Sequence, residues 1–232
     1  MLNNFLFIGL PYIAIVLFFG GIIYRGFSGI MSGYRGTWDW GSRGDYYWTT
    51  RSTGFFGRAS IGPAALTLHW GIIVLFFAHI IGLIGGAYAL ATWVDIFRWA
   101  GMGGGILLLF GIIWALVRRI IIPQVKAMSH TEDYLILVFL ILITGFGLWQ
   151  SVVQLAFGVA YAAGPWLGSI LRLQPDALLM AGAPLINKLH IITALLFFSY
   201  LPFTKLVHFM SYPFGYITRS FISVRKYRAV KK

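Results

Sequence analysis

Five long apolar segments, separated by polar connections, dominate the pattern of the chain. Each is close to or above the roughly 20 residues that an α-helix needs to cross the hydrocarbon core of a bilayer. The pattern predicts an all-α integral membrane protein with one membrane domain over residues 1–232, ending in a basic tail over residues 211–232. The expected spans lie at about residues 2–23, 63–90, 104–122, 134–161 and 185–210.

The first apolar segment fits the prediction of a membrane span. The first apolar segment carries no positive start and no small-residue cleavage pattern, so we expect a retained span and not a cleaved signal peptide. A long polar and aromatic connection, Tyr24–Gly62, separates the first two spans. The sequence does not indicate its role.

Composition supports a membrane protein. Hydrophobic residues make up 59% of the chain and charged residues 10%, against about 25% charged residues in soluble domains. The absence of cysteine excludes disulfides and iron–sulfur ligation by this chain, so any iron–sulfur cluster must belong to a partner. A net charge of +12 can indicate nucleic-acid binding. Here the basic residues flank apolar spans, so we expect a bilayer and no nucleic acid.

The basic residues also predict the orientation. With five spans, fifteen of the eighteen Lys and Arg residues fall on one side, and the other side has only Arg98, Arg172 and Lys188. The positive-inside rule then predicts a protein of the cytoplasmic membrane with the N-terminus outside and the C-terminus in the cytoplasm.

Four histidines inside apolar spans are the candidate chemistry. His69 and His79 are ten residues apart in the second span, and His190 and His208 are eighteen apart in the fifth. Histidine within a membrane span is usually functional, and imidazole is an axial ligand of haem iron. If the two spans are antiparallel, His69 lies level with His208 and His79 level with His190.

The spacings therefore predict two bis-histidine b haems within the five-helix bundle. The inner haem would use His69 and His208, and the outer haem His79 and His190. The ten-residue and eighteen-residue separations correspond to roughly 15 Å and 27 Å along a helix. His69 and His79 are offset by roughly 80° around their helix. Tilt of the helix and the length of the side chains must compensate for this offset if both are to bind haem.

Two alternatives stay open on the residues alone. The histidines could be core residues that bond a neighbouring carbonyl, or a proton or metal relay in a transporter or channel. Against a transporter, the chain has no inverted repeat and no carboxylate pattern within its spans. The fifth histidine, His130, stands in a polar connection before the fourth span and is expected to be solvated.

Neighbouring residues add candidates for supporting roles. Basic residues on the cytoplasmic side are candidate partners of haem propionates: Lys205, Arg58, Arg118 and Arg119. Pro202, between the two histidines of the fifth span, should bend that helix. For most of a set of glycines in and beside the spans we expect ordinary helix–helix packing. These glycines are Gly82, Gly85, Gly86, Gly101, Gly103, Gly104, Gly105, Gly145 and Gly147.

Several motifs resemble one family. The end of the chain is similar to the end of the gamma subunit of membrane-bound respiratory nitrate reductase. The residues that carry the similarity are Lys188–His190, Pro202–His208 and Ser211–Arg219. The ten-residue histidine spacing, the five-span layout, the basic turn over residues 117–126 followed by Asp133, and residues 173–180 also resemble this family.

The resemblance implies a function. The family's gamma subunit is a di-haem cytochrome b, and the pairing it implies agrees with the pairing above. It implies that quinol from the quinone pool, menaquinol or ubiquinol, is oxidised beside the outer haem. Electrons then pass inward to an iron–sulfur subunit and to a molybdenum subunit that reduces nitrate. A related alternative is the haem-b quinol-oxidising subunit of another reductase, of the sulfite or heterodisulfide type, although the motif at the chain's end favours the nitrate type.

The sequence departs from the family beside the outer haem. The connection Ala91–Gly103 is shorter than in the best-known members, and a lysine associated there with quinol binding has no clear match. Arg98 is the basic residue of this connection and the candidate to replace it. Glycines after His79 would allow close approach of quinol: Gly82, Gly85 and Gly86.

Overall fold

The computed structural model describes residues 1–31, 58–88, 90–158, 161 and 163–207. Within these residues the fold is all-α, and five helices are long and apolar enough to cross a membrane. These candidate spans are Leu2–Arg25, Ile61–Gly86, Thr92–Ile121, Thr131–Phe157 and Leu185–Phe203. The predicted all-α class and the five candidate spans are confirmed.

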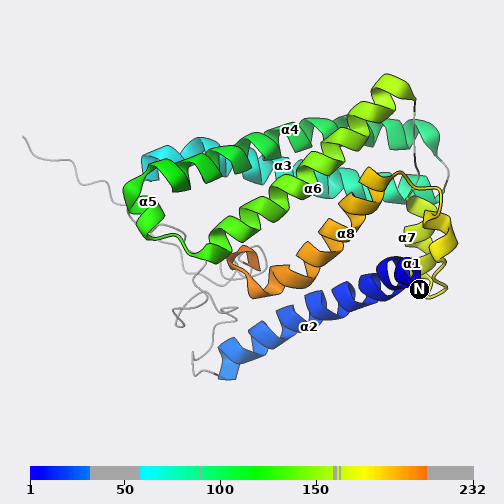
Figure 1. Cartoon of the computed structure of the whole chain (residues 1–232), viewed down its shortest axis with the longest axis horizontal. Helices are drawn as coiled ribbons and strands as arrows, with labels where there is room; N and C mark the ends of the chain where they lie inside the picture. The colour runs from blue at the N-terminus through cyan, green and yellow to red at the C-terminus, as the bar shows by residue number, and fades with distance from the viewer. Residues whose placement is uncertain (32–57, 89, 159–160, 162, 208–232) are drawn as a thin grey trace, which may run out of the picture.

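The helices follow one another with short connections wherever the chain is described (Figure 1). The first candidate span comprises α1, a π-helical turn and α2, which follow without a break. The long helices are α2 Leu10–Met31, α3 Arg58–Ala87, α4 Ala91–Ile121, α6 Thr131–Phe157 and α8 Leu185–Tyr200. The shorter elements are α1 Leu2–Asn4, η1 Phe5–Gly9, α5 Pro123–Ala127, α7 Gly164–Leu171, η3 Ala177–Met180, η4 Leu201–Phe203 and η5 Lys205–Val207.

The outward faces of the long helices are apolar. Only 17% to 33% of the residues in each span's most apolar window are buried inside the protein. Large side chains such as Trp70, Phe76 and Ile113 are therefore exposed. Hydrocarbon is the solvent in which such a surface is stable, which agrees with a bundle surrounded by lipid.

Glycines allow α3 and α4 to pack closely. A Cβ atom at Gly71 of α3 would lie 2.6 Å from the backbone nitrogen of Leu108. One at Gly111 of α4 would lie 2.7 Å from the backbone nitrogen of Leu68. Small residues at such contacts let two backbones approach each other. The sequence analysis did not single out Gly71 or Gly111, whose close contacts only the structure reveals.

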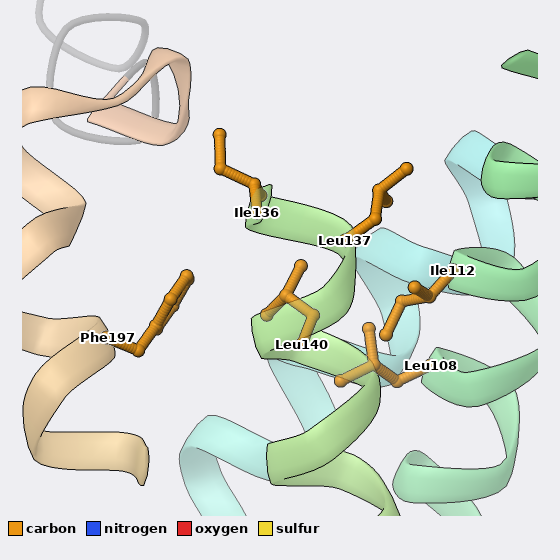
Figure 2. Packing of buried hydrophobic residues seen from close by; sticks show 6 residues of the cluster. All are labelled: Leu108, Ile112, Ile136, Leu137, Leu140 and Phe197. Atoms are coloured by element: carbon orange, nitrogen blue, oxygen red, sulfur yellow. The ribbon is translucent and has the colours of Figure 1, made fainter. Parts of the chain in front are cut away.

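An apolar cluster joins the next layer to this helix pair. Leu108 and Ile112 of α4 face Ile136, Leu137 and Leu140 of α6, and Phe197 of α8 completes the cluster (Figure 2). Helix α6 therefore lies between α4 and α8 and packs on both.

The first span is attached to the bundle at its N-terminal end by α7, which the sequence pattern did not predict. The Trp166 indole N–H donates to the Phe7 carbonyl at 2.9 Å, and the Tyr12 hydroxyl donates to the Ile170 carbonyl at 3.1 Å. Trp166 and Ile170 are both buried, together with Phe7 and Met180. Figure 1 shows α7 beside α1 at this end of the molecule.

Several boundaries differ from those that hydropathy predicts. Residues 91–103, expected to be a connection, form the first turns of α4. Their charged residues lower the hydropathy, but Asp95 and Arg98 form an ion pair three residues apart, which a helix accommodates. Helix α2 likewise continues to Met31, eight residues beyond the expected end of the first span.

The fifth span also ends early as an α-helix. Helix α8 stops at Tyr200, and η4 and η5 continue the chain as short 3₁₀ turns. Pro202 has no backbone N–H and cannot extend the α-helical ladder. The bend expected at Pro202 is thus a change of helix type. His208, residues 32–57 and the tail over residues 211–232 lie outside the described residues.

Replacing Gly111 by alanine should destabilise the α3–α4 contact. The new methyl group would be placed 2.7 Å from the Leu68 nitrogen and 2.8 Å from the Thr67 hydroxyl oxygen. Overpacking of this kind costs about 1–3 kcal/mol. Thermal unfolding in one detergent should therefore show a lower Tm for Gly111→Ala. Gly103→Ala, in the same helix with no atom within 4 Å of its Cβ position, is the matched control. Equal Tm changes in the two variants would contradict this packing.

Candidate functional site

His79 of α3 and His190 of α8 face each other across the bundle. Their ring centres are 6.2 Å apart and their ring planes are inclined by 20°. His79 lies towards the C-terminal end of α3 and His190 near the N-terminal end of α8. The structure therefore brings together the two histidines that the sequence predicts to share one level of the membrane.

Hydrogen bonds define which nitrogen of each ring carries the proton. Nδ1 of His79 is 2.7 Å from the Leu75 carbonyl oxygen, and Nδ1 of His190 is 2.9 Å from the Ile143 carbonyl oxygen. A carbonyl oxygen can only accept, so each Nδ1 must be the donor. The lone pair of each neutral ring then lies on Nε2, the tautomer that can bind a metal through that nitrogen.

The geometry fits two imidazoles bound to one metal ion. With about 2 Å for each metal–nitrogen bond and about 1 Å from each nitrogen to its ring centre, two opposed imidazoles have centres about 6 Å apart. The observed 6.2 Å agrees with this separation. Within the described residues, neither Nε2 atom has a hydrogen-bond partner. The alternative of ordinary core histidines accounts for the Nδ1 bonds and leaves both Nε2 atoms unexplained.

Helix α6 holds the His190 ring in place. Ile143 accepts the hydrogen bond, and one turn later Gly147 lies against the ring. A Cβ atom at Gly147 would be 3.1 Å from Cε1 of His190, whereas one at Gly145 would have no atom within 4 Å. Sequence reasoning treated both glycines as packing residues. Glycines are common in membrane spans, so nothing in the sequence indicated that Gly147 would contact the His190 ring.

The inner pair is described only in part. Nδ1 of His69 lies 2.6 Å from the Ala65 carbonyl oxygen, the same arrangement as at His79. Its expected partner His208 is outside the described residues. His130 is exposed directly before α6, as expected for a solvated position, and its backbone N–H donates to Asp133 Oδ2 at 3.0 Å.

Two of the four candidate propionate partners share a buried carboxylate. Asp133 Oδ1 is 3.0 Å from Lys205 Nζ, and Asp133 Oδ2 is 3.3 Å from a guanidinium nitrogen of Arg119. Arg118 is buried in α4, and Arg58 is the first residue of α3. Sequence reasoning used Asp133 only within a family motif. Its position at the start of α6, opposite a basic turn, was the available signal for an ion pair.

The candidate quinol residues lie where α3 meets α4 and α7. A Cβ atom at Gly85 would overlap the Trp93 indole, and one at Gly82 would lie 3.5 Å from Phe97 Cβ. One at Gly86 would lie 3.8 Å from the Gly164 backbone. These glycines therefore make room for protein atoms at the described contacts. Arg98 is on α4, in an ion pair with Asp95.

A groove at the same end of the bundle was not predicted. It encloses about 450 Å³ between the end of α3 and α7. Apolar and aromatic side chains line it, with one cation: Ile84, Tyr88, Gly168, Leu171 and Arg172. Its two walls are distant in the sequence, so only the fold reveals it.

Comparison with known proteins assigns the family. The family model described as nitrate reductase gamma subunit matches residues 3–227. The chain belongs to the nitrate reductase gamma subunit family. This membership agrees with the motifs at the end of the chain, and it favours the nitrate type over the sulfite or heterodisulfide type of subunit.

Individual relatives agree with the family. The chain is similar to the nitrate reductase gamma chain of Bacillus subtilis strain 168, with 29% identity over 94% of this chain and 95% of the relative. It is 28% identical to the respiratory nitrate reductase 1 gamma chain of Escherichia coli K12, over 97% of each. It is 34% identical to the nitrate reductase-like protein NarX of Mycobacterium tuberculosis H37Rv, over 82% of this chain and 31% of the relative. Similarity to gamma chains thus extends over nearly the whole chain.

Asp133→Asn should destabilise this gamma subunit strongly. The substitution leaves Arg119 and Lys205 without their shared carboxylate, and breaking a buried ion pair costs about 3–5 kcal/mol. Asp95→Asn removes a carboxylate that is 60% exposed, so its cost should stay below about 1 kcal/mol. Thermal unfolding in detergent measures both. A Tm for Asp133→Asn as high as that for Asp95→Asn would rule out a stabilising role for the Asp133 cluster.

Proposed function

We propose that this gamma subunit is a di-haem cytochrome b that oxidises quinol and passes electrons to the other subunits of a nitrate reductase. The observation that carries the proposal is the pair formed by His79 and His190, whose ring centres are 6.2 Å apart, whose Nδ1 atoms bond carbonyls and whose Nε2 atoms have no hydrogen-bond partner in the described structure. Family membership supports nitrate reductase as the complex to which this subunit belongs.

Two haem b groups are the cofactors that these histidines suit. His79 and His190 would hold the outer haem, and His69 and His208 the inner one. Haem iron would supply one-electron chemistry. The Nδ1 bond of His69 to Ala65 supports the second site, because it prepares that imidazole in the same way.

The protein's own contribution is orientation. Hydrogen bonds from Nδ1 to the carbonyls of Leu75 and Ile143 fix the rotation of each ring and raise the basicity of Nε2. Gly147 leaves room for the His190 ring, so α6 can support it from one side.

The orientation proposed for the bundle assigns a direction to the reaction. The distribution of Lys and Arg supports an N-terminus outside the cytoplasmic membrane and a C-terminus in the cytoplasm. His79 and His190 would then lie on the outer side. Quinol oxidised there would release its protons outside, while the electrons would leave towards the cytoplasm.

Family membership supports partner subunits that carry the remaining redox centres. It has no cysteine with which to hold an iron–sulfur cluster. We propose that an iron–sulfur subunit receives the electrons on the cytoplasmic side and that a molybdenum subunit reduces nitrate.

Replacing single histidines tests the haem assignment. His79→Ala and His190→Ala should each remove the same component of the reduced-minus-oxidised spectrum of the purified complex. His69→Ala should remove a different component. His130→Ala is the control, since His130 is exposed outside the spans, and it should keep both. A wild-type complex without haem, or loss of one shared component from His69→Ala and His79→Ala, would refute the assignment.

Arg98→Ala tests the quinol site. Quinol-dependent reduction of both haems should slow about tenfold, because a hydrogen bond to a charged group contributes about 1.5 kcal/mol or more. The haem spectra should not change, since Arg98 is no ligand here. Stopped-flow reduction by a quinol analogue measures the rate. Lys126→Ala, an exposed cation of α5, is the control. If Arg172→Ala slows reduction and Arg98→Ala does not, the quinol site is the groove between α3 and α7.

A further inference from the structure

The groove between α3 and α7 has walls that the protein itself holds in place. Helix α7 packs beside the last turns of α3 (Figure 1). Hydrogen bonds of Trp166 and Tyr12 also join α7 to the first span, so this wall has a fixed position. The groove encloses about 450 Å³. The residues that line it are Ile84, Tyr88, Gly168, Leu171 and Arg172.

The α3 wall extends beyond the end of the membrane span. The candidate span Ile61–Gly86 includes Ile84, whereas Tyr88 lies two residues after its end. The Tyr88 backbone N–H donates to the Ile84 carbonyl at 3.2 Å, so the two residues remain on one side of the helix. Tyrosine is enriched at the interface between membrane and water. The groove therefore has an apolar part at the depth of the hydrocarbon and a polar part at the depth of the head groups.

Arg172 gives the groove a positive charge that has no counter-ion within the described residues. Its side chain is exposed, and no hydrogen bond or ion pair to another described residue engages its guanidinium. The other two cations on this side of the bundle do have partners. Arg98 pairs with Asp95, and Lys188 Nζ donates to the Ala181 carbonyl at 3.3 Å. Arg172 is thus the cation at this end that can receive an anion.

Gly168 makes room for the Arg172 guanidinium. A Cβ atom at Gly168 would lie 3.1 Å from a guanidinium nitrogen of Arg172. The side chain of Arg172 therefore folds back along α7 by about one turn. Gly168, Leu171 and Arg172 are three and four residues apart, which places them on one side of α7. The charge and an apolar side chain consequently line the same wall.

The surface beside Arg172 is suited to lipid. Leu171, Leu173 and Leu178 are 70%, 76% and 80% exposed. Leu173 has a φ of 59°, in the left-handed region that leucine rarely adopts and glycine adopts without strain. An exposed leucine at such a position is unfavourable in water and favourable against hydrocarbon. The entrance to the groove therefore has an apolar rim.

We propose that this groove binds one anionic phospholipid from the adjacent leaflet. Arg172 and the Tyr88 hydroxyl would donate to its phosphate, and Ile84 and Leu171 would contact an acyl chain. Arginine suits phosphate oxygens because its planar guanidinium presents several donors. Basic pockets between membrane helices bind phospholipid head groups by the same chemistry. A quinol is uncharged and would leave the guanidinium without a counter-ion, which favours phospholipid as the occupant.

Lipid titration of the purified, delipidated complex tests this site. Native mass spectrometry would count the bound lipids, with dioctanoyl phosphatidylglycerol as the anionic probe and dioctanoyl phosphatidylcholine as its zwitterionic counterpart. Arg172→Gln should weaken binding of one phosphatidylglycerol about tenfold, because a hydrogen bond to a charged group is lost. Lys188→Gln is the matched control, since it removes a cation at the same end and should leave that binding unchanged. Equal affinities of the wild type for the two probes would overturn the proposal.

A pair of glycine variants separates the position of the charge from its presence. Gly168→Ala would displace the guanidinium and keep the charge, whereas a Cβ atom at Gly182 would meet nothing within 4 Å. Gly168→Ala should therefore weaken phosphatidylglycerol binding, and Gly182→Ala should not. Wild-type affinity in Gly168→Ala, or the same loss in Lys188→Gln as in Arg172→Gln, would show general attraction of charge and overturn the groove as the site.

Stopped-flow reduction by a quinol analogue distinguishes the two classes of occupant. Slower reduction in Arg172→Gln together with unchanged phosphatidylglycerol affinity would assign the groove to quinol and overturn the phospholipid site. The lipid titration does not depend on haem, because none of the groove residues is a proposed haem ligand. A wild-type complex without haem would therefore refute the proposed function and leave the titration to decide the lipid site.

Discussion

The hydrogen bond from His190 to the Ile143 carbonyl sets the position of the candidate site within the bundle. It links α8 to α6, directs the imidazole towards His79, and leaves Nε2 as the nitrogen with the lone pair. The bond requires α6 and α8 to be close, which Gly147 permits and the cluster around Leu140 and Phe197 maintains. Packing and ligand chemistry are therefore set by the same helix.

Polar groups elsewhere in the bundle obey the same constraint. In an apolar environment a donor or acceptor must find its partner within the protein. His69 and His79 bond carbonyls of their own helix, Asp133 gathers Arg119 and Lys205, and Arg25 bonds the carbonyls exposed after α8. The contacts of Asp133 and Arg25 join elements that hydropathy treats only as separate spans. The few charged residues thus determine how the spans are assembled.

Hydropathy was sufficient for the fold class and for the approximate positions of five spans. Helical spacing was also sufficient to pair His79 with His190, since antiparallel spans bring equal depths together. It could not predict α7, whose eight residues are too few for a span signal, or the early end of α8. Nor could it predict that residues 91–103 are helical, because charges that lower hydropathy can pair along a helix, as Asp95 and Arg98 do.

Site residues outside the histidines were harder to predict because their partners are remote in the sequence. Gly147 contacts the ring of His190, which lies 43 residues later in the sequence. Arg25 bonds the carbonyls of Pro202 and Thr204, which lie 177 and 179 residues later. None of the motifs that resemble the family lies in the first span, yet its Arg25 donates to carbonyls at the end of the fifth. The chain continues beyond α8 as 3₁₀ turns, and Arg25 donates to the Pro202 carbonyl within the first of them.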